Sequence, residues 1–125
     1  MIVDVGAVSA ILAGRESIKP VIFAGAMLAI PVIVVGEYRY ALSGSSRERE
    51  IERAFDRLIR SMHILTIDER TAEYYAVLRR RLAGPAHPPS ENGLWIAALA
   101  RQYELPILSR ESYFDDVPGV RRLGW

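Results

Sequence analysis

The chain is organised around the segment Glu91-Asn92-Gly93-Leu94-Trp95-Ile96-Ala97-Ala98-Leu99-Ala100 and the run Leu105-Pro106-Ile107-Leu108-Ser109-Arg110-Glu111 that follows it. The segment is predicted to be a helix, because Ser90 is a favourable N-cap after a proline-rich loop and a largely apolar face follows. The run is short, apolar and polar at its end, which is typical of a buried parallel strand. Helix N-termini and the carboxyl ends of parallel strands are where α/β folds bind ligands, so we expect part of a functional site here.

Length and composition predict one ordered domain over residues 1–125. Half of the residues are apolar and a quarter are charged, which is ordinary for a globular chain. The chain holds no cysteine, which excludes a disulfide framework and a zinc–thiolate site. We expect a cytoplasmic protein, because Asp4 interrupts the first apolar run and the apolar stretch 21–35 is shorter than the roughly 20 residues of a membrane span.

The positive charge of the chain comes almost entirely from arginine. Fifteen of its sixteen basic residues are arginines, Lys19 is the exception, and the formal net charge is +1. Arginine suits bidentate contacts with phosphate, so this composition allows an RNA partner. Genomic base composition and surface ion pairing explain the same bias equally well.

The order of the expected elements indicates an α/β fold. We expect helices at 7–12, 18–27, 31–42, 47–62, 68–82 and 91–100, and strands at 1–4, 28–30, 63–67, 105–109 and 120–123. Strands separated by helices predict a parallel sheet with helices on both faces.

Two charged surfaces have competing interpretations. The helix at 47–62 has apolar residues at i, i+3, i+4 spacing and a charged opposite face, which predicts a solvated surface helix or, less simply, a groove for a partner. The run 79–81 of three arginines suits the negative end of a helix dipole, or else an RNA contact.

Of the two histidines, His63 begins a strand and is expected to be structural, while His87 lies in a loop that borders the expected site.

Three carboxylates are the candidates for chemistry. Asp4 ends the first strand and also suits a helix cap. Glu37 lies on an apolar helix, where an unpaired charge is costly, so it either serves a site or pairs with Arg39 or Arg110. Glu111 follows the fourth strand, where it either serves a site or caps a turn.

Parallel topology predicts that these acids converge, because the ends of the first and fourth strands can face one crevice. Carboxylates about 4 Å apart repel by a few kcal/mol at an effective dielectric near 20, and a cation relieves that repulsion. Oxygen-only ligands favour Mg²⁺ or Mn²⁺, whose common use is phosphodiester hydrolysis.

Four stretches resemble, in order and spacing, the PIN domains of VapC-type toxins: 1–4, 30–40, 91–98 and 108–120. The resemblance spans the whole chain and implies a three-layer α/β/α sandwich around a parallel sheet of about five strands. It also implies a Mg²⁺- or Mn²⁺-dependent endoribonuclease toxin, usually a homodimer that a VapB-type antitoxin neutralises.

Carried over by position, the resemblance implies that Asp4, Glu37 and Glu111 are the catalytic and metal-binding residues. Glu111 stands where the family usually has aspartate. The family usually has Asn-Asp before the tryptophan-containing run, whereas this chain has Asn92-Gly93.

The surroundings of the first acid also depart from the family pattern. Val5 and Gly6 replace the hydroxyl or amide residues that commonly follow it. Glu91, Asp115 and Asp116 are the acids nearest in sequence that could compensate for Gly93, although Glu91 falls about 200° away around a helix.

We therefore expect an endoribonuclease that cleaves RNA phosphodiesters with a metal-activated water, its activity weakened by Gly93. The alternative is a degraded PIN-fold module that binds antitoxin or RNA without cleavage. A flavodoxin-like or receiver-like domain is a third and weaker interpretation, because fold class alone is shared by unrelated functions. If Gly93 is the defect, Gly93→Asp is expected to raise activity.

Overall fold

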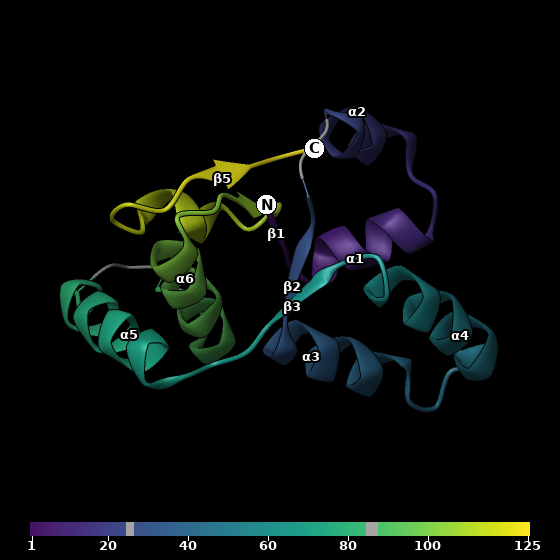
Figure 1. Ribbon diagram of the computed structural model, residues 1–125, viewed down its shortest axis with the longest axis horizontal. Helices are drawn as coiled ribbons and strands as arrows, with labels where there is room; N and C mark the ends of the chain where they lie inside the picture. Colours follow the sequence, from purple (N-terminus) through teal and green to yellow (C-terminus); the bar gives the residue numbers. More distant parts are fainter. Residues whose placement is uncertain (25–26, 85–87) are drawn as a thin grey trace.

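The computed structural model describes residues 1–24, 27–84 and 88–125, with a five-stranded parallel sheet at its centre (Figure 1). The strands are short: β1 (Ile2–Val3), β2 (Ala29–Pro31), β3 (His63–Leu65), β4 (Ile107–Leu108) and β5 (Arg122–Leu123). Their order across the sheet is β3-β2-β1-β4-β5, and each neighbouring pair is parallel. The predicted parallel sheet of about five strands is confirmed.

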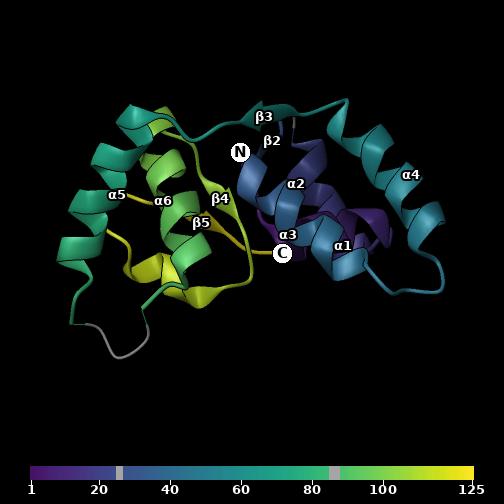
Figure 2. The same cartoon turned by 90° about the horizontal axis from the view of Figure 1, so that it is seen from below.

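Helices cover both faces of this sheet. The described residues form α1 (Val5–Leu12), α2 (Lys19–Phe23), α3 (Val32–Leu42), α4 (Glu48–Ile59), α5 (Glu69–Arg81) and α6 (Glu91–Tyr103). The two views together place α1 to α4 on one side of the strands and α5 with α6 on the other (Figure 1 and Figure 2). Right-handed crossovers explain this division, because the chain crosses the sheet one way from β1 to β3 and returns from β3 to β4. The three-layer α/β/α prediction is confirmed.

The core lies where these layers meet the central strands. Ile2 and Val3 of β1 and Ile107 and Leu108 of β4 are completely buried. Such continuous apolar strands are expected in a parallel sheet that is covered on both faces. The short polar segments that follow β1 and β4 are therefore anchored to fully buried strands.

Several element boundaries differ from the predicted ones. The helix expected at 18–27 is a 3₁₀ turn, η1 (Glu16–Ile18), followed by the five-residue α2, and part of the expected range, 25–26, lies outside the described residues. Pro20 lies in the first turn of α2, a position where its missing N–H costs no hydrogen bond. The helix expected at 47–62 ends at Ile59. The expected order of strands and helices is otherwise confirmed.

The described residues contain no helix that is both long enough and apolar enough to cross a membrane.

Candidate active site

The crossover direction reverses at β1, which pairs with β2 on one side and with β4 on the other. In open α/β sheets this switch point, at the carboxyl ends of the strands, is the usual place for a ligand crevice. Asp4 follows β1 directly, and Ser109 follows β4. The predicted convergence of the first and fourth strand ends is therefore present.

Asp4 is both a helix cap and part of this crevice. Its Oδ1 accepts a hydrogen bond from the backbone N–H of Ala7 over 2.7 Å, which caps the N-terminus of α1. Its Oδ2 accepts a hydrogen bond from the hydroxyl of Ser109, a completely buried residue. The Ser109 hydroxyl in turn accepts from the backbone N–H of Glu111 over 3.0 Å. Ser109 thus ties two of the candidate acids together, a role that the sequence pattern did not indicate.

The Asp4 carboxyl titrates above its ordinary range. Burial raises its pKa, and the carboxylates of Glu111 and Glu37 raise it further. The hydrogen bonds from Ser109 and Ala7 act in the opposite direction. Glu37 and Glu111 therefore both lie close enough to Asp4 for their charges to act on its carboxyl.

Glu37 reaches the crevice from α3 and is held there by an amide. The side-chain Nδ2 of Asn92, in the first turn of α6, donates to Glu37 Oε1 over 2.8 Å. The alternative pairing of Glu37 with Arg39 or Arg110 is wrong. Arg39 turns away to Glu52 and Asp56 on α4, at 3.1 and 2.8 Å.

Arg110, the other suggested partner of Glu37, packs against an aromatic ring instead. Its guanidinium carbon lies 5.0 Å from the ring centroid of Trp125. Neither arginine neutralises Glu37.

The three acids line one cavity of about 380 Å³. Among the described residues its walls contain no basic side chain: Asp4, Val5, Gly6, Glu37, Ser90, Asn92, Gly93, Ile96, Glu111 and Tyr113. We refer to it as the acidic cavity. No cation from this described lining balances its negative charge.

Tyr113 occupies the space beside Gly93. A Cβ atom on residue 93 would lie 2.9 Å from the Tyr113 Oη and 3.1 Å from Ser90 Oγ. Burial raises the pKa of the Tyr113 hydroxyl, a hydrogen bond with Ser90 lowers it, and the charges of Glu111, Asp4 and Glu37 raise it further. The position that lacks an acid is therefore filled by a phenol from the segment after β4.

Comparison with known proteins identifies the fold family. The PIN domain family matches residues 1–120 of the chain. The chain belongs to the PIN domain family. A search of curated proteins returned no match.

Solved structures with the same fold include VapBC complexes. A chain in the crystal structure of VapBC2 from Rickettsia felis bound to a promoter DNA fragment is 19% identical, with a TM-score of 0.88 and coverage of 99% of this chain and 97% of that one. A chain in DNA-bound VapBC from Salmonella typhimurium is 20% identical, with a TM-score of 0.87 and coverage of 99% and 96%. These likenesses show that the folds agree over nearly the full length.

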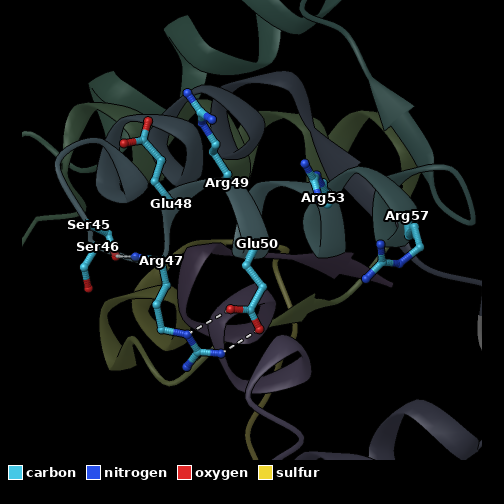
Figure 3. Close-up of a pocket in the computed structure, with 8 residues that line it drawn as sticks. All are labelled: Ser45, Ser46, Arg47, Glu48, Arg49, Glu50, Arg53 and Arg57. Atoms are coloured by element: carbon cyan, nitrogen blue, oxygen red, sulfur yellow. Dashed lines mark hydrogen bonds and ion pairs between the residues drawn. The ribbon is translucent and has the colours of Figure 1, made fainter.

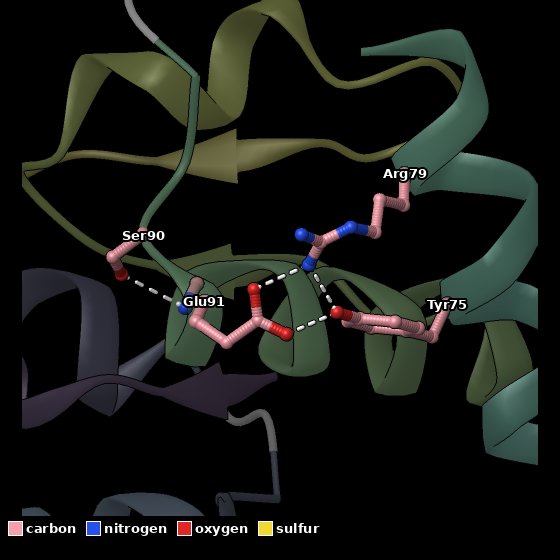
Figure 4. Close-up of polar contacts among 5 residues, drawn as sticks. Tyr75, Arg79, Ser90 and Glu91 are labelled. Carbon is pink, nitrogen blue, oxygen red and sulfur yellow. Dashed lines mark hydrogen bonds and ion pairs between the residues drawn. The ribbon is translucent and has the colours of Figure 1, made fainter. Parts of the chain in front are cut away.

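The other acids of this PIN chain lie outside the acidic cavity. Glu91 turns to the opposite side of α6, where it accepts from the Tyr75 hydroxyl and pairs with Arg79 at 2.5 Å (Figure 4). Asp115 pairs with Arg122 at 2.7 Å. Asp116 is exposed and does not line the cavity. In this structure no further acid takes the place of an acid at position 93.

A larger cavity of about 640 Å³ lies on α4, away from the PIN acids. It is lined by Ser45, Ser46 and six charged residues of α4 and its start: Arg47, Glu48, Arg49, Glu50, Arg53 and Arg57. Figure 3 shows Arg47 and Glu50 paired there, at 2.8 Å. The arrangement fits the predicted solvated helix face, and none of the candidate site residues takes part in it.

A second cavity of about 380 Å³ adjoins the acidic one, and its lining contains basic as well as acidic side chains. It shares Asp4, Gly6 and Glu111 with the acidic cavity and adds Arg15, Arg110 and Trp125. Neither of these arginines forms an ion pair within residues 1–24, 27–84 and 88–125. We call it the arginine cavity.

His87, which lies in the loop expected to border the site, is outside the described residues.

The donor set of the PIN site fits a hard divalent cation. Its charged groups are carboxylates, and Mg²⁺ and Mn²⁺ prefer such oxygen ligands. Within the described chain, no three acidic or histidine side chains are already gathered closely enough to hold an ion together. Mg²⁺ commonly keeps several waters and binds through one or two carboxylates, so separated acids suit a hydrated ion.

Proposed function

We propose that this PIN chain is a VapC-like endoribonuclease toxin that cleaves RNA phosphodiesters with Mg²⁺ or Mn²⁺ held by Asp4, Glu37 and Glu111. The observation that carries the proposal is the acidic cavity itself. Three carboxylates from three separate elements line it, and no basic side chain of residues 1–24, 27–84 and 88–125 does. Such a concentration of negative charge favours a bound cation over an empty site.

The chain's own residues would prepare the carboxylates for this role. The Ser109 hydroxyl and the Ala7 N–H orient Asp4, and the Asn92 amide orients Glu37. Glu111 is exposed, so its side chain is free to adjust. When bound, the ion would supply positive charge that stabilises the phosphate in the transition state and would lower the pKa of a water molecule.

The arginine cavity supports a polyanionic substrate. Arg15 and Arg110 offer guanidinium groups beside the acids, and guanidinium forms bidentate contacts with phosphate. Trp125 adds an aromatic surface of the kind on which bases of single-stranded RNA stack. A strand whose scissile phosphate lies in the acidic cavity would place its neighbouring nucleotide in the arginine cavity.

We further propose a VapB-type antitoxin partner and a homodimer. Two of the solved structures that share this fold are named as VapBC assemblies, which supports the antitoxin. Phe23 on α2 is 79% exposed and Tyr40 on α3 is 82% exposed, and such exposed apolar side chains suit protein contacts. Light scattering on the purified chain tests the dimer, and co-purification with the product of an adjacent open reading frame tests the antitoxin.

RNA cleavage tests the catalytic proposal. Wild-type protein, Asp4→Asn and Glu37→Gln are incubated with structured RNAs and Mg²⁺ or Mn²⁺. Cleavage by the wild type alone is expected. Equal cleavage by all three proteins, or cleavage by none, contradicts the assignment.

The second candidate function is a PIN module that has lost catalysis and retained binding. Gly93 provides no ligand, and within the described residues the acids are not gathered into a ready metal set, which favours this alternative. Calorimetry with Mn²⁺ separates the two. Micromolar binding that disappears in Glu37→Gln supports the enzyme, and no binding by the wild type supports the module.

A further inference from the structure

We propose that Tyr113 provides a neutral hydrogen-bond donor to the RNA phosphate in the acidic cavity, and that residue 93 is a glycine because the Tyr113 hydroxyl occupies its side-chain space. This inference rests on the proposed ribonuclease function and adds a substrate-contacting residue to it.

The first argument is steric. A Cβ on residue 93 would lie 2.9 Å from Tyr113 Oη and 3.1 Å from its Cε2, which is closer than ordinary carbon contacts allow. Gly36, on α3, has nothing within 4 Å of the corresponding point. A side chain at position 93 would therefore meet the Tyr113 ring, whereas a side chain at position 36 would meet no obstruction.

The second argument concerns how Tyr113 is held. It lies in η2 (Ser112–Asp116), directly before the buried Phe114, and the two ring centroids are 4.5 Å apart. Phe114 anchors the turn in the core. The Tyr113 ring is half-buried, and its hydroxyl stands beside Ser90 at the wall of the acidic cavity.

The third argument is chemical. Carboxylates only accept hydrogen bonds when ionised, and so do the non-bridging oxygens of a phosphodiester. Of the other side-chain donors in the lining, one N–H of the Asn92 amide is engaged with Glu37, and the Ser90 hydroxyl accepts from the Gly93 N–H and lies against the Tyr113 hydroxyl. A phenol is neutral near pH 7 and carries one O–H donor. Tyr113 would thus attract the phosphate where a fourth carboxylate would repel it.

The test uses Tyr113→Phe, which keeps the ring and removes the hydroxyl, Gly93→Ala, which introduces the Cβ, and Gly36→Ala as the matched control. Binding of a fluorescent single-stranded RNA is measured by anisotropy in Ca²⁺, a cation that takes oxygen ligands, because the metal-free carboxylates would repel the phosphate. Mn²⁺ affinity is measured by calorimetry, and cleavage is measured with Mn²⁺.

Tyr113→Phe is expected to weaken RNA binding about tenfold, as for loss of a hydrogen bond to a charged group, while Mn²⁺ affinity stays unchanged. Gly93→Ala is expected to weaken RNA binding at least as much, and Gly36→Ala not at all. Because both changes act on one hydroxyl, the double variant Gly93→Ala with Tyr113→Phe should bind RNA only slightly more weakly than Gly93→Ala alone.

Wild-type RNA affinity in Tyr113→Phe, or fully additive effects in the double variant, would overturn the inference. The proposed function fails separately, by an absence of Mn²⁺ binding and cleavage in the wild type. In that case the anisotropy measurement still decides whether Tyr113 contacts RNA.

Discussion

Asn92 Nδ2 donates a 2.8 Å hydrogen bond to Glu37 Oε1, and this bond joins α6 to α3 from opposite faces of the sheet. The two residues are 55 positions apart in the chain. The amide fixes the direction of the carboxylate and leaves its negative charge in place. Glu37 thus remains available as a ligand in a cavity whose described lining holds no cation.

Replacing the amide by a second carboxylate should make stability depend on a divalent ion. In Asn92→Asp two carboxylates would meet at hydrogen-bond distance, and we expect a loss of about 2 kcal/mol in EDTA that Mn²⁺ reverses. Asn92→Ala is the control, because it removes the hydrogen bond without adding charge. Thermal unfolding of both variants with and without Mn²⁺ measures this. Equal stability of the two variants in EDTA would contradict the close contact.

The buried Asp4 should contribute a loss of stability to the metal-free protein as the pH rises, visible as the difference between the wild type and Asp4→Asn. Burial raises the pKa of its carboxyl in the folded state, so the folded protein binds the proton more tightly than the unfolded chain does. Stability therefore falls from the unfolded pKa of about 3.8 upward, until the raised folded pKa is passed. Asp4→Asn keeps the Oδ1 that caps α1 and removes this fall. Urea unfolding in EDTA from pH 4 to 8 checks it, with the exposed Asp116→Asn as control.

Removing the Ser109 hydroxyl should loosen two acids at once. Ser109→Ala deletes the donor to Asp4 and the acceptor for the Glu111 N–H, both at a buried position. We expect a loss of about 1–3 kcal/mol in stability and weaker Mn²⁺ binding. Ser61→Ala, an exposed serine on the opposite side of the fold from this site, should change neither. If Ser109→Ala binds Mn²⁺ as tightly as the wild type, the hydroxyl does not organise the site.

The arginine cavity predicts a separable contribution to RNA binding. Arg110→Ala and Arg15→Ala should each weaken RNA binding and reduce its dependence on salt, because each removes one phosphate contact. Mn²⁺ affinity should not fall. Arg57→Ala, in the cavity on α4, is the matched control and should leave the salt dependence unchanged. A larger effect from Arg57 than from Arg110 would place the RNA on α4 instead.

The layers of the fold and the convergence of the candidate acids were predictable from the sequence, because parallel topology brings the ends of β1 and β4 together. The partners of individual side chains were not predictable from it. Arg39 lies two residues from Glu37, yet it pairs with Glu52 and Asp56 because α4 packs beside α3. Those pairings depend on where helices meet, which periodicity does not encode.

The same limit applies to position 93. From the sequence the glycine is a gap in an acidic motif, and Gly93→Asp is expected to raise activity. In the fold the gap is filled by a ring from η2. Only the course of the chain after β4 decides this, and no local pattern predicts it.

Gly93→Asp alone should therefore lower RNA cleavage rather than raise it. The new side chain would collide with the Tyr113 hydroxyl, and either the ring or the start of α6 would have to move. Combining it with Tyr113→Ala removes the obstruction, so the double variant should bind Mn²⁺ more tightly than Gly93→Asp does. Calorimetry with Mn²⁺ and cleavage assays on the single and double variants measure both effects. Higher cleavage by Gly93→Asp alone would mean that Tyr113 yields its place readily and that the missing acid is the whole defect.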